Sequence, residues 1–284
     1  MPESMSSPPP NFQRPNGSNI FSLPAMTTSV ASRASGSSSA GYFTKLSKPS
    51  IILAKKVIAE FIGTYILIFS AAATPIVNQK YNDAATLIGA ATSAGLAVTI
   101  IVISIGHISG AHLNPSVTIA FAAIHHFPWP HVPAYILAQL LGSIAASFTL
   151  SGVFHPFHSG GVTVPTISTS QAFFLEFVIT SVLMFVIVAV ATDTRAPREL
   201  AGVAIGATIL MNILVAGSST GGSMNPVRTL GPAIATSNYK EIWLYMVAPV
   251  IGAVFGAYAY QVVKLHVEDM EVILAPPMME IMNA

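Results

Sequence analysis

Long apolar stretches separated by short polar segments run from residue 51 to residue 264. A transmembrane helix needs about 20 mostly apolar residues to cross the hydrocarbon core of a bilayer. Two further apolar runs, residues 114–124 and 225–235, are too short to span and are more typical of re-entrant segments. The six predicted spans are residues 57–77, 85–107, 131–151, 171–192, 199–217 and 242–263.

The composition agrees with a chain whose main solvent is lipid. Hydrophobic residues make up 52% of the chain and charged residues 8%, whereas about a quarter of the residues of a soluble domain are charged. The formal net charge of +1 predicts no nucleic-acid partner, and the absence of cysteine excludes disulfides and thiolate chemistry. Nothing in the composition predicts a cofactor.

The two ends of the chain differ from its apolar middle. Residues 1–50 are rich in Ser, Pro, Gly and Asn, and we expect a disordered tail, because they cannot bury enough apolar surface to fold. A transit peptide is the alternative, although basic residues are sparse there. Basic residues flank the first span and the loop between spans four and five, which predicts that both termini are cytosolic. Residues 265–284 are then a cytosolic C-terminal tail.

The apolar region contains an internal repeat, about residues 51–151 and 171–263. Each half has a Glu-Phe pair in its first span, at Glu60 and Glu176, and an Asn-Pro pair after its second span. Since each copy holds three spans, the two copies must have opposite topologies, an arrangement typical of channels and transporters. Glycines four residues apart, 202 with 206 and 252 with 256, predict close helix packing.

The two Asn-Pro motifs predict the starts of two half-helices. Asn is a favoured N-cap, and Pro is favoured at the first helical position. Inverted symmetry would bring both N-termini together near the bilayer midplane, where their partial positive charges repel cations and protons. The Asn side chains would offer N–H donors to a passing solute. The motifs are Asn114-Pro115-Ser116 and Asn225-Pro226-Val227.

These motifs carry a family resemblance. The runs 106–115 and 221–232 resemble the aquaporin (major intrinsic protein) superfamily, and the similarity covers about residues 55–263. Ser116 and Val227, in place of the usual Ala, are similar to the boric-acid-channel subgroup of the plant nodulin-26-like proteins. The resemblance implies an all-α membrane protein with six transmembrane helices and two re-entrant half-helices. It makes residues 51–264 a passive channel domain, in a homotetramer of the plasma membrane.

The resemblance also implies a selectivity filter formed by Ala94, Ile213, Gly222 and Arg228. Arg228 is a cation within an apolar stretch, and an intramembrane charge is a functional hypothesis by default. Ala94 and Gly222 remove bulk, Ile213 offers no hydrogen bond, and Arg228 supplies a fork of donors. This ring suits boric acid or arsenous acid, with glycerol and urea as further candidate solutes, and it predicts low water flux. A general water and glycerol aquaporin is the alternative.

Two buried acids and two histidines complete the predicted site. The resemblance implies that Glu60 and Glu176 hold the re-entrant loops. The spacing adds Thr64 and Thr180, each four residues after its Glu, as expected partners of these acids. A proton relay is the alternative use of a buried carboxylate. His107 and His112 are expected to line the cytosolic vestibule. The remaining histidines lie in or beside loops without carboxylates or cysteines, so we expect no metal site.

Three other classes of function fit the sequence less well. A secondary transporter should have coupling charges at the midplane, whereas the sequence places two amides there. An intramembrane enzyme would need a nucleophile and base, paired acids or a metal set, and none lies in the spans. A structural protein with a closed pore fits poorly with Arg228 and two intact Asn-Pro motifs.

Overall fold

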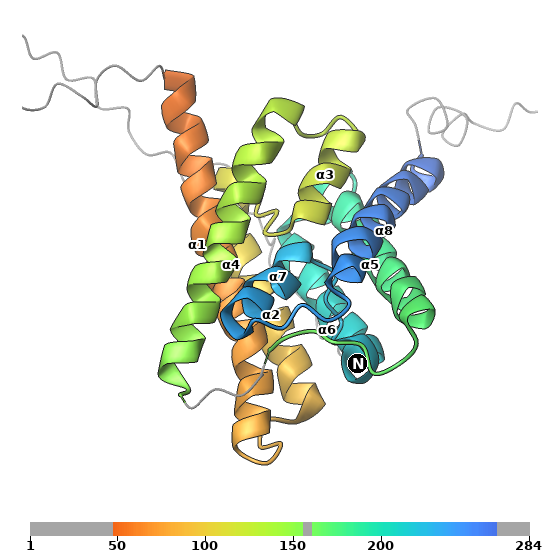
Figure 1. Cartoon of the computed structure of the whole chain (residues 1–284). Helices are drawn as coiled ribbons and strands as arrows, with labels where there is room; N and C mark the ends of the chain where they lie inside the picture. The colour runs from red at the N-terminus through yellow and green to blue at the C-terminus, as the bar shows by residue number, and fades with distance from the viewer. Residues whose placement is uncertain (1–47, 156–160, 266–284) are drawn as a thin grey trace, which may run out of the picture. The chain divides into compact units, whose positions relative to one another are not determined.

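The computed structural model describes residues 48–155 and 161–265, and every regular element in this part of the chain is helical (Figure 1). The predicted tails lie almost entirely outside the described residues. The α-helices are α1 (Lys48–Lys80), α2 (Thr86–Ser109), α3 (Pro115–Ala123), α4 (Val132–Val153), α5 (Thr169–Thr192), α6 (Ala201–Thr220), α7 (Pro226–Thr236) and α8 (Ile242–Val263). Single 3-10 turns, η2 (Trp129–His131) and η3 (Arg198–Leu200), precede α4 and α6.

The long helices coincide with the predicted spans. Within the described residues, α2, α4, α5, α6 and α8 (α4 and α6 counted with their preceding 3-10 turns) are long and apolar enough to cross a membrane. The first predicted span lies inside α1, which has 33 residues. At 1.5 Å per residue α1 is about 50 Å long, against roughly 30 Å for the hydrocarbon core. Both ends of α1 therefore extend into polar surroundings, where Lys55, Lys56 and Lys80 lie.

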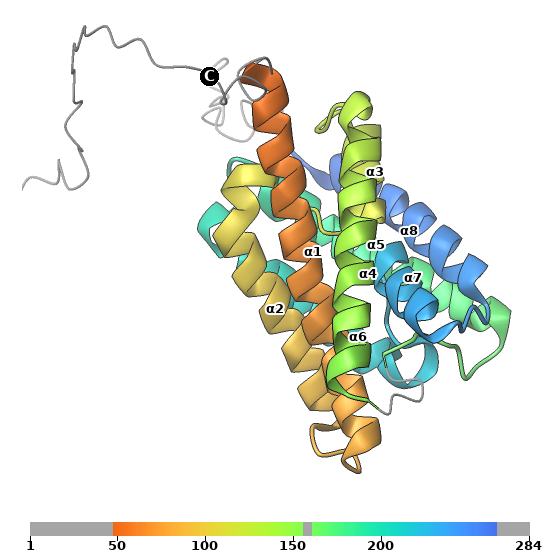
Figure 2. The ribbon, with the colours of Figure 1, turned by 60° about the vertical axis from the view of Figure 1, so that its left-hand side comes forward.

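The two halves of the repeat interlock through their short helices. In the first half α1 packs against α2 and α4, and in the second half α5 packs against α6 and α8. Helices α2 and α6 join the halves, while α3 packs against α8 and α7 packs against α4 (Figures 1 and 2). Each half-helix is thus held by a long helix of the opposite half.

Glycines allow the long helices to approach one another at backbone distance. A Cβ on Gly142 of α4 would lie 2.5 Å from the carbonyl oxygen of Phe61, and a Cβ on Gly252 or Gly256 of α8 would overlap a backbone carbonyl of α5. A Cβ on Gly206 would likewise overlap the backbone of α2. A Cβ on Gly202 would lie 3.0 Å from the carbonyl oxygen of Thr99. The prediction of close packing at Gly202, Gly206, Gly252 and Gly256 is confirmed.

Both half-helices begin as the Asn-Pro motifs predict. Gly110 follows the last residue of α2 and Gly221 follows the last residue of α6, and both are in the left-handed conformation, with φ of 94° and 85°. A short loop then leads to an extended N-cap, Asn114 or Asn225, with proline at the first helical position. Glycine tolerates a positive φ without steric cost, so it suits the sharp reversal at each loop.

Candidate functional site

A cavity of about 730 Å³ runs between the two halves and is lined by both re-entrant loops. Its wall is largely apolar and comes from α1, α2, α5 and α6. The predicted site residues that line it are Ala94, His107, His112, Asn114, Ile213, Gly222, Asn225 and Arg228. Pro115, Ser116, Pro226 and Val227 are buried and are not part of the lining.

The two Asn side chains connect the loops to each other. Asn114 Oδ1 accepts a hydrogen bond from its own half-helix, and Asn114 Nδ2 donates to the carbonyl of Met224 in the opposite loop at 2.7 Å. Asn225 does the same in reverse, with Nδ2 donating to the carbonyl of Leu113 at 2.9 Å. One N–H of each amide is therefore used across the loop interface. An amide has two such donors, so one remains on each side for the cavity.

The residues that receive these bonds are held in a strained conformation. Leu113 and Met224 have φ of 57° and 54°, which residues other than glycine rarely adopt. Strain of this kind persists only where the surroundings over-determine the backbone. Here the N–H of each residue is bound by a buried carboxylate and its carbonyl by the opposite Asn. These four bonds fix the direction of the loop carbonyls.

Glu60 and Glu176 are fully buried behind the loops, and neither lines the cavity. Glu60 accepts hydrogen bonds from two loop N–H groups at 2.8 and 2.9 Å, from Ser109 Oγ at 2.7 Å and from Gln139 Nε2 at 2.9 Å. Glu176 accepts from two loop N–H groups at 2.8 and 2.9 Å and from Thr220 Oγ1 at 2.6 Å. Both oxygens of each carboxylate thus face donors from the adjacent loop.

The expectation that Thr64 and Thr180 bond the carboxylates of Glu60 and Glu176 is wrong. Thr180 Oγ1 donates to the backbone carbonyl of Glu176 at 2.6 Å and not to its carboxylate. Thr64 Oγ1 has no hydrogen-bond partner among the described residues. A Thr inside a helix commonly bonds the carbonyl one turn before it, so the spacing of four residues did not identify a carboxylate contact.

All four predicted filter residues line the cavity. Gly222 has φ of 55°, and a Cβ there would lie 3.3 Å from Ile213 Cα. Gly222 and Ile213 are therefore direct neighbours. Arg228 is part-buried, and its Nη1 donates to the carbonyl of Gly161 at 2.7 Å. That bond holds one edge of the guanidinium against the segment that follows α4.

Sequence reasoning missed several residues that hold the loops. Tyr135 donates to the carbonyl of Ser109 at 2.8 Å, and Tyr245 donates to the carbonyl of Thr220 at 2.6 Å, so each re-entrant loop has a tyrosine behind it. Aligning the last spans of the two halves would have found this pair. Gly161, in contrast, lies in a short segment outside the repeat, where no sequence pattern identifies it as a contact of Arg228.

His107 and His112 both line the cavity, but they come from different parts of the chain. His107 is in the last turn of α2 and not in the re-entrant loop. His112 is in the loop, and its ring contacts Phe121, Phe127 and Tyr135. Its Nδ1 lies 3.2 Å from Thr118 Oγ1, so the ring packs in an aromatic cluster as well as facing the cavity.

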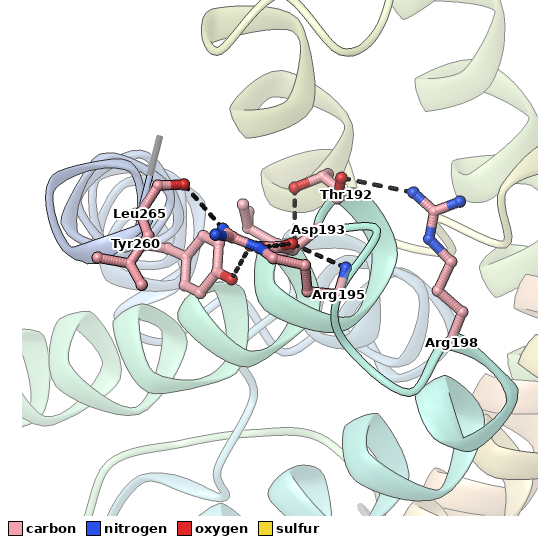
Figure 3. Close-up of polar contacts among 7 residues, drawn as sticks. Thr192, Asp193, Arg195, Arg198, Tyr260 and Leu265 are labelled. Atoms are coloured by element: carbon pink, nitrogen blue, oxygen red, sulfur yellow. Dashed lines mark hydrogen bonds and ion pairs between the residues drawn. The ribbon is translucent and has the colours of Figure 1, made fainter. Parts of the chain in front are cut away.

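At one mouth of the cavity the loop after α5 is tied to the end of α8 (Figure 3). Arg195 forms an ion pair with Asp193 at 2.7 Å and donates to the carbonyl of Leu265, while Tyr260 donates to Asp193. The hydrogen bonds from Arg195 hold the pKa of Asp193 well below its usual range. Arg198, three residues further on, lines the mouth of the cavity.

Comparisons with known proteins agree on one family. The Major intrinsic protein family model matches residues 46–260. The chain is 66% identical over 224 residues to probable aquaporin NIP5-1 of Arabidopsis thaliana, which covers 79% of this chain and 74% of that protein. It is 50% identical over 218 residues to Nodulin-26 of Glycine max, covering 76% of this chain and 80% of that protein.

A solved structure has the same architecture. The X-ray structure of the aquaglyceroporin from Plasmodium falciparum matches with a TM-score of 0.67 at 29% sequence identity, over 73% of this chain and 95% of that one. The inverted repeat, the paired half-helices and these relatives agree. The chain belongs to the major intrinsic protein family of membrane channels and, within it, to the plant NIP aquaporins.

Proposed function

We propose that this channel conducts small uncharged hydroxylated solutes, with boric acid as the preferred one and arsenous acid as a close relative. The composition of the filter carries the proposal. Ala94 and Gly222 contribute little bulk to the lining, and Ile213 contributes no hydrogen bond. Arg228 supplies fixed donors beside this open apolar wall. Such a ring fits a flat neutral hydroxide better than a single file of water.

Electrostatics at the loop junction supports passage of neutral solutes. Two half-helix N-termini, each with roughly half a positive charge, face the cavity at Asn114 and Asn225. Arg228 adds a full positive charge on the same wall. Cations are repelled by this arrangement. Boric acid is uncharged near neutral pH and meets no such barrier.

Glu60 and Glu176 act in this proposal as the holders of the loops and not as a proton relay. Donors from the adjacent loop occupy both oxygens of each carboxylate, and neither acid faces the cavity. A relay would need an acid in contact with the permeation path. His107 and His112 serve as polar lining of the cytosolic vestibule.

The assembly and its placement complete the proposal. We infer a homotetramer with one pore in each protomer, in the plasma membrane, with both termini cytosolic. The mouth that carries Arg195 and Arg198 is the cytosolic one, since basic residues accumulate on cytosolic loops. Residues 51–264 form the channel, and the segments before and after it are cytosolic tails. Light scattering on detergent-purified protein measures the subunit number, and protease protection of tagged termini measures the orientation.

Similarity to an aquaglyceroporin favours glycerol as the second candidate solute. Stopped-flow uptake into proteoliposomes separates the candidates, with boric acid, glycerol and water compared for the wild type and Ile213→His. We expect fast boric acid uptake, little added water flux, and loss of boric acid uptake in the variant. Ile209→His is the matched control, because Ile209 lines the same cavity one helical turn from Ile213. High water flux with background boric acid uptake would overturn the proposal.

A further inference from the structure

The segment after α4 is locked onto the second re-entrant loop by a chain of buried hydroxyl groups. Thr163 Oγ1 and Thr229 Oγ1 share a hydrogen bond of 2.6 Å, and Thr229 Oγ1 shares another of 2.8 Å with Ser223 Oγ. All three residues are 2–4% exposed. The backbone N–H of Ser223 in turn donates to Glu176. The chain therefore connects the scaffold acid of α5 to a segment that has no helix of its own.

This hydroxyl chain stands directly behind the filter. Thr229 follows Arg228 on α7, and Thr163 lies two residues after Gly161, whose carbonyl binds Arg228 Nη1. The methyl group of Thr163 also lies over Gly221, where a Cβ would come within 2.6 Å of it. The position of the Gly161 carbonyl thus depends on how Thr163 is seated, and that carbonyl sets where the guanidinium lies.

In the first half of the repeat, the equivalent Thr has different hydrogen-bond partners. Its counterpart of Thr229 is Thr118, which is contacted by His112 Nδ1 at 3.2 Å and by Gln139 Nε2 at 3.0 Å. Gln139 belongs to the long helix α4, so that hub is anchored to a rigid element. In the second half Thr229 is contacted instead by Thr163, which lies in the segment after α4. The same segment also binds Arg228, through the carbonyl of Gly161.

We propose that Thr163, through its hydroxyl contact with Thr229, is a positioning residue that sets solute selectivity by fixing Arg228. Thr163 is not among the residues that line the cavity, so its effect on the solute passes through Arg228. Without the Thr163 hydroxyl, the segment after α4 is no longer fixed in position against the second re-entrant loop. The carbonyl of Gly161 then no longer confines Arg228. The expected consequence is weaker discrimination by size at an intact pore.

Thr163→Val removes the hydroxyl and keeps the shape, while Thr163→Ser keeps the hydroxyl. Uptake of glycerol and urea into proteoliposomes gives a ratio that does not depend on how much protein is inserted. We expect Thr163→Val to raise the glycerol-to-urea ratio by about three- to tenfold, the range that one buried hydrogen bond commonly contributes to an equilibrium. Thr163→Ser should keep the wild-type ratio. Thr229→Val also removes the bond to Ser223, so it should raise the ratio at least as much as Thr163→Val, and adding Thr163→Val to it should change the ratio no further.

Thr166→Val is the control within the same segment, since its hydroxyl is exposed and bonds the end of α6 instead. It should leave the ratio unchanged. A ratio in Thr163→Val that is unchanged or lowered overturns the proposal, including the case where both fluxes fall together. A Thr163→Ser variant that behaves like Thr163→Val overturns it too. Because glycerol and urea are the probes, failure of boric acid to permeate would reject the proposed function without affecting this test.

Discussion

The two scaffold acids should respond unequally to the same substitution, Glu→Gln. In the Gln side chain an NH₂ group replaces one of the two accepting oxygens. This NH₂ group faces a loop N–H, so two hydrogen-bond donors point at each other. In Glu176→Gln the least costly orientation loses the bond from the Met224 N–H, which is 2.8 Å long in the wild type. Losing a hydrogen bond to a charged group costs about 1.5–3 kcal/mol, and the new buried donor adds about 1–3 kcal/mol. We expect a total loss of roughly 2.5–6 kcal/mol.

Glu60→Gln should be milder because α4 offers the new amide a partner. Gln139 Nε2 donates to Glu60, and Gln139 Oε1 has no hydrogen-bond partner among the described residues. A rotation of the Gln139 amide by half a turn would present Oε1 to the new NH₂ group and also to the hydroxyl of Thr118, which Nε2 contacts in the wild type. The position equivalent to Gln139 in the second half is Pro249, which has no such group. The penalty should therefore be lower by about 1–3 kcal/mol than in Glu176→Gln.

Unfolding titrations with SDS in mixed micelles measure this difference directly. Gln139→Leu, alone and combined with each acid variant, provides the control. Combined with Glu60→Gln it should raise the penalty beyond the sum of the two single effects, and with Glu176→Gln the effects should add. The reasoning is refuted if Glu60→Gln is as destabilising as Glu176→Gln, or if Gln139→Leu adds to both equally.

Two other predictions concern packing and pH. Gly252→Ala should destabilise the protein by about 1–3 kcal/mol, because a Cβ there overlaps the carbonyl of Phe177. Gly152→Ala is the control and should be tolerated, because nothing lies within 4 Å of a Cβ at that position. Equal melting points for the two variants in detergent would contradict this account of the packing. Since Arg195 lowers the pKa of Asp193, this carboxylate stabilises the fold above its ordinary pKa of 3.8 and loses that effect as the pH falls toward the lowered value. The difference in melting point between wild type and Asp193→Asn should thus stay constant from about pH 7 to pH 5 and shrink only below about pH 4; a difference already lost at pH 5 would show that the ion pair does not hold Asp193.

The spans and half-helices could be predicted from the sequence because lipid imposes a simple rule on composition. Apolar length marks a span, and an Asn-Pro pair before a short apolar run marks a half-helix start. Both signals are local, so one sequence was enough. The repeat then located Glu60 and Glu176, since the same dipeptide occurs in the first span of each half.

The parts of the site that were missed depend on contacts between distant segments. Gly161 meets Arg228 across 67 residues of sequence, and Thr163 meets Thr229 across 66. The composition of residues 161–166 predicts neither contact. The Thr180 prediction failed for the opposite reason: a regular spacing was present, but the hydroxyl of a helical Thr most easily bonds its own helix, as Thr180 does.

Folding and selectivity use different atoms of the same loops, and this separation explains why filter residues can be varied. The bonds that hold the loops end on backbone groups of Leu113 and Met224 and on acids outside the cavity. The predicted filter side chains at 94 and 213 instead project from α2 and α6, and no bond of the loop scaffold passes through them. A substitution at position 213 should therefore change which solute passes while the loops keep their geometry. A change at Glu60 or Glu176 should remove both properties together.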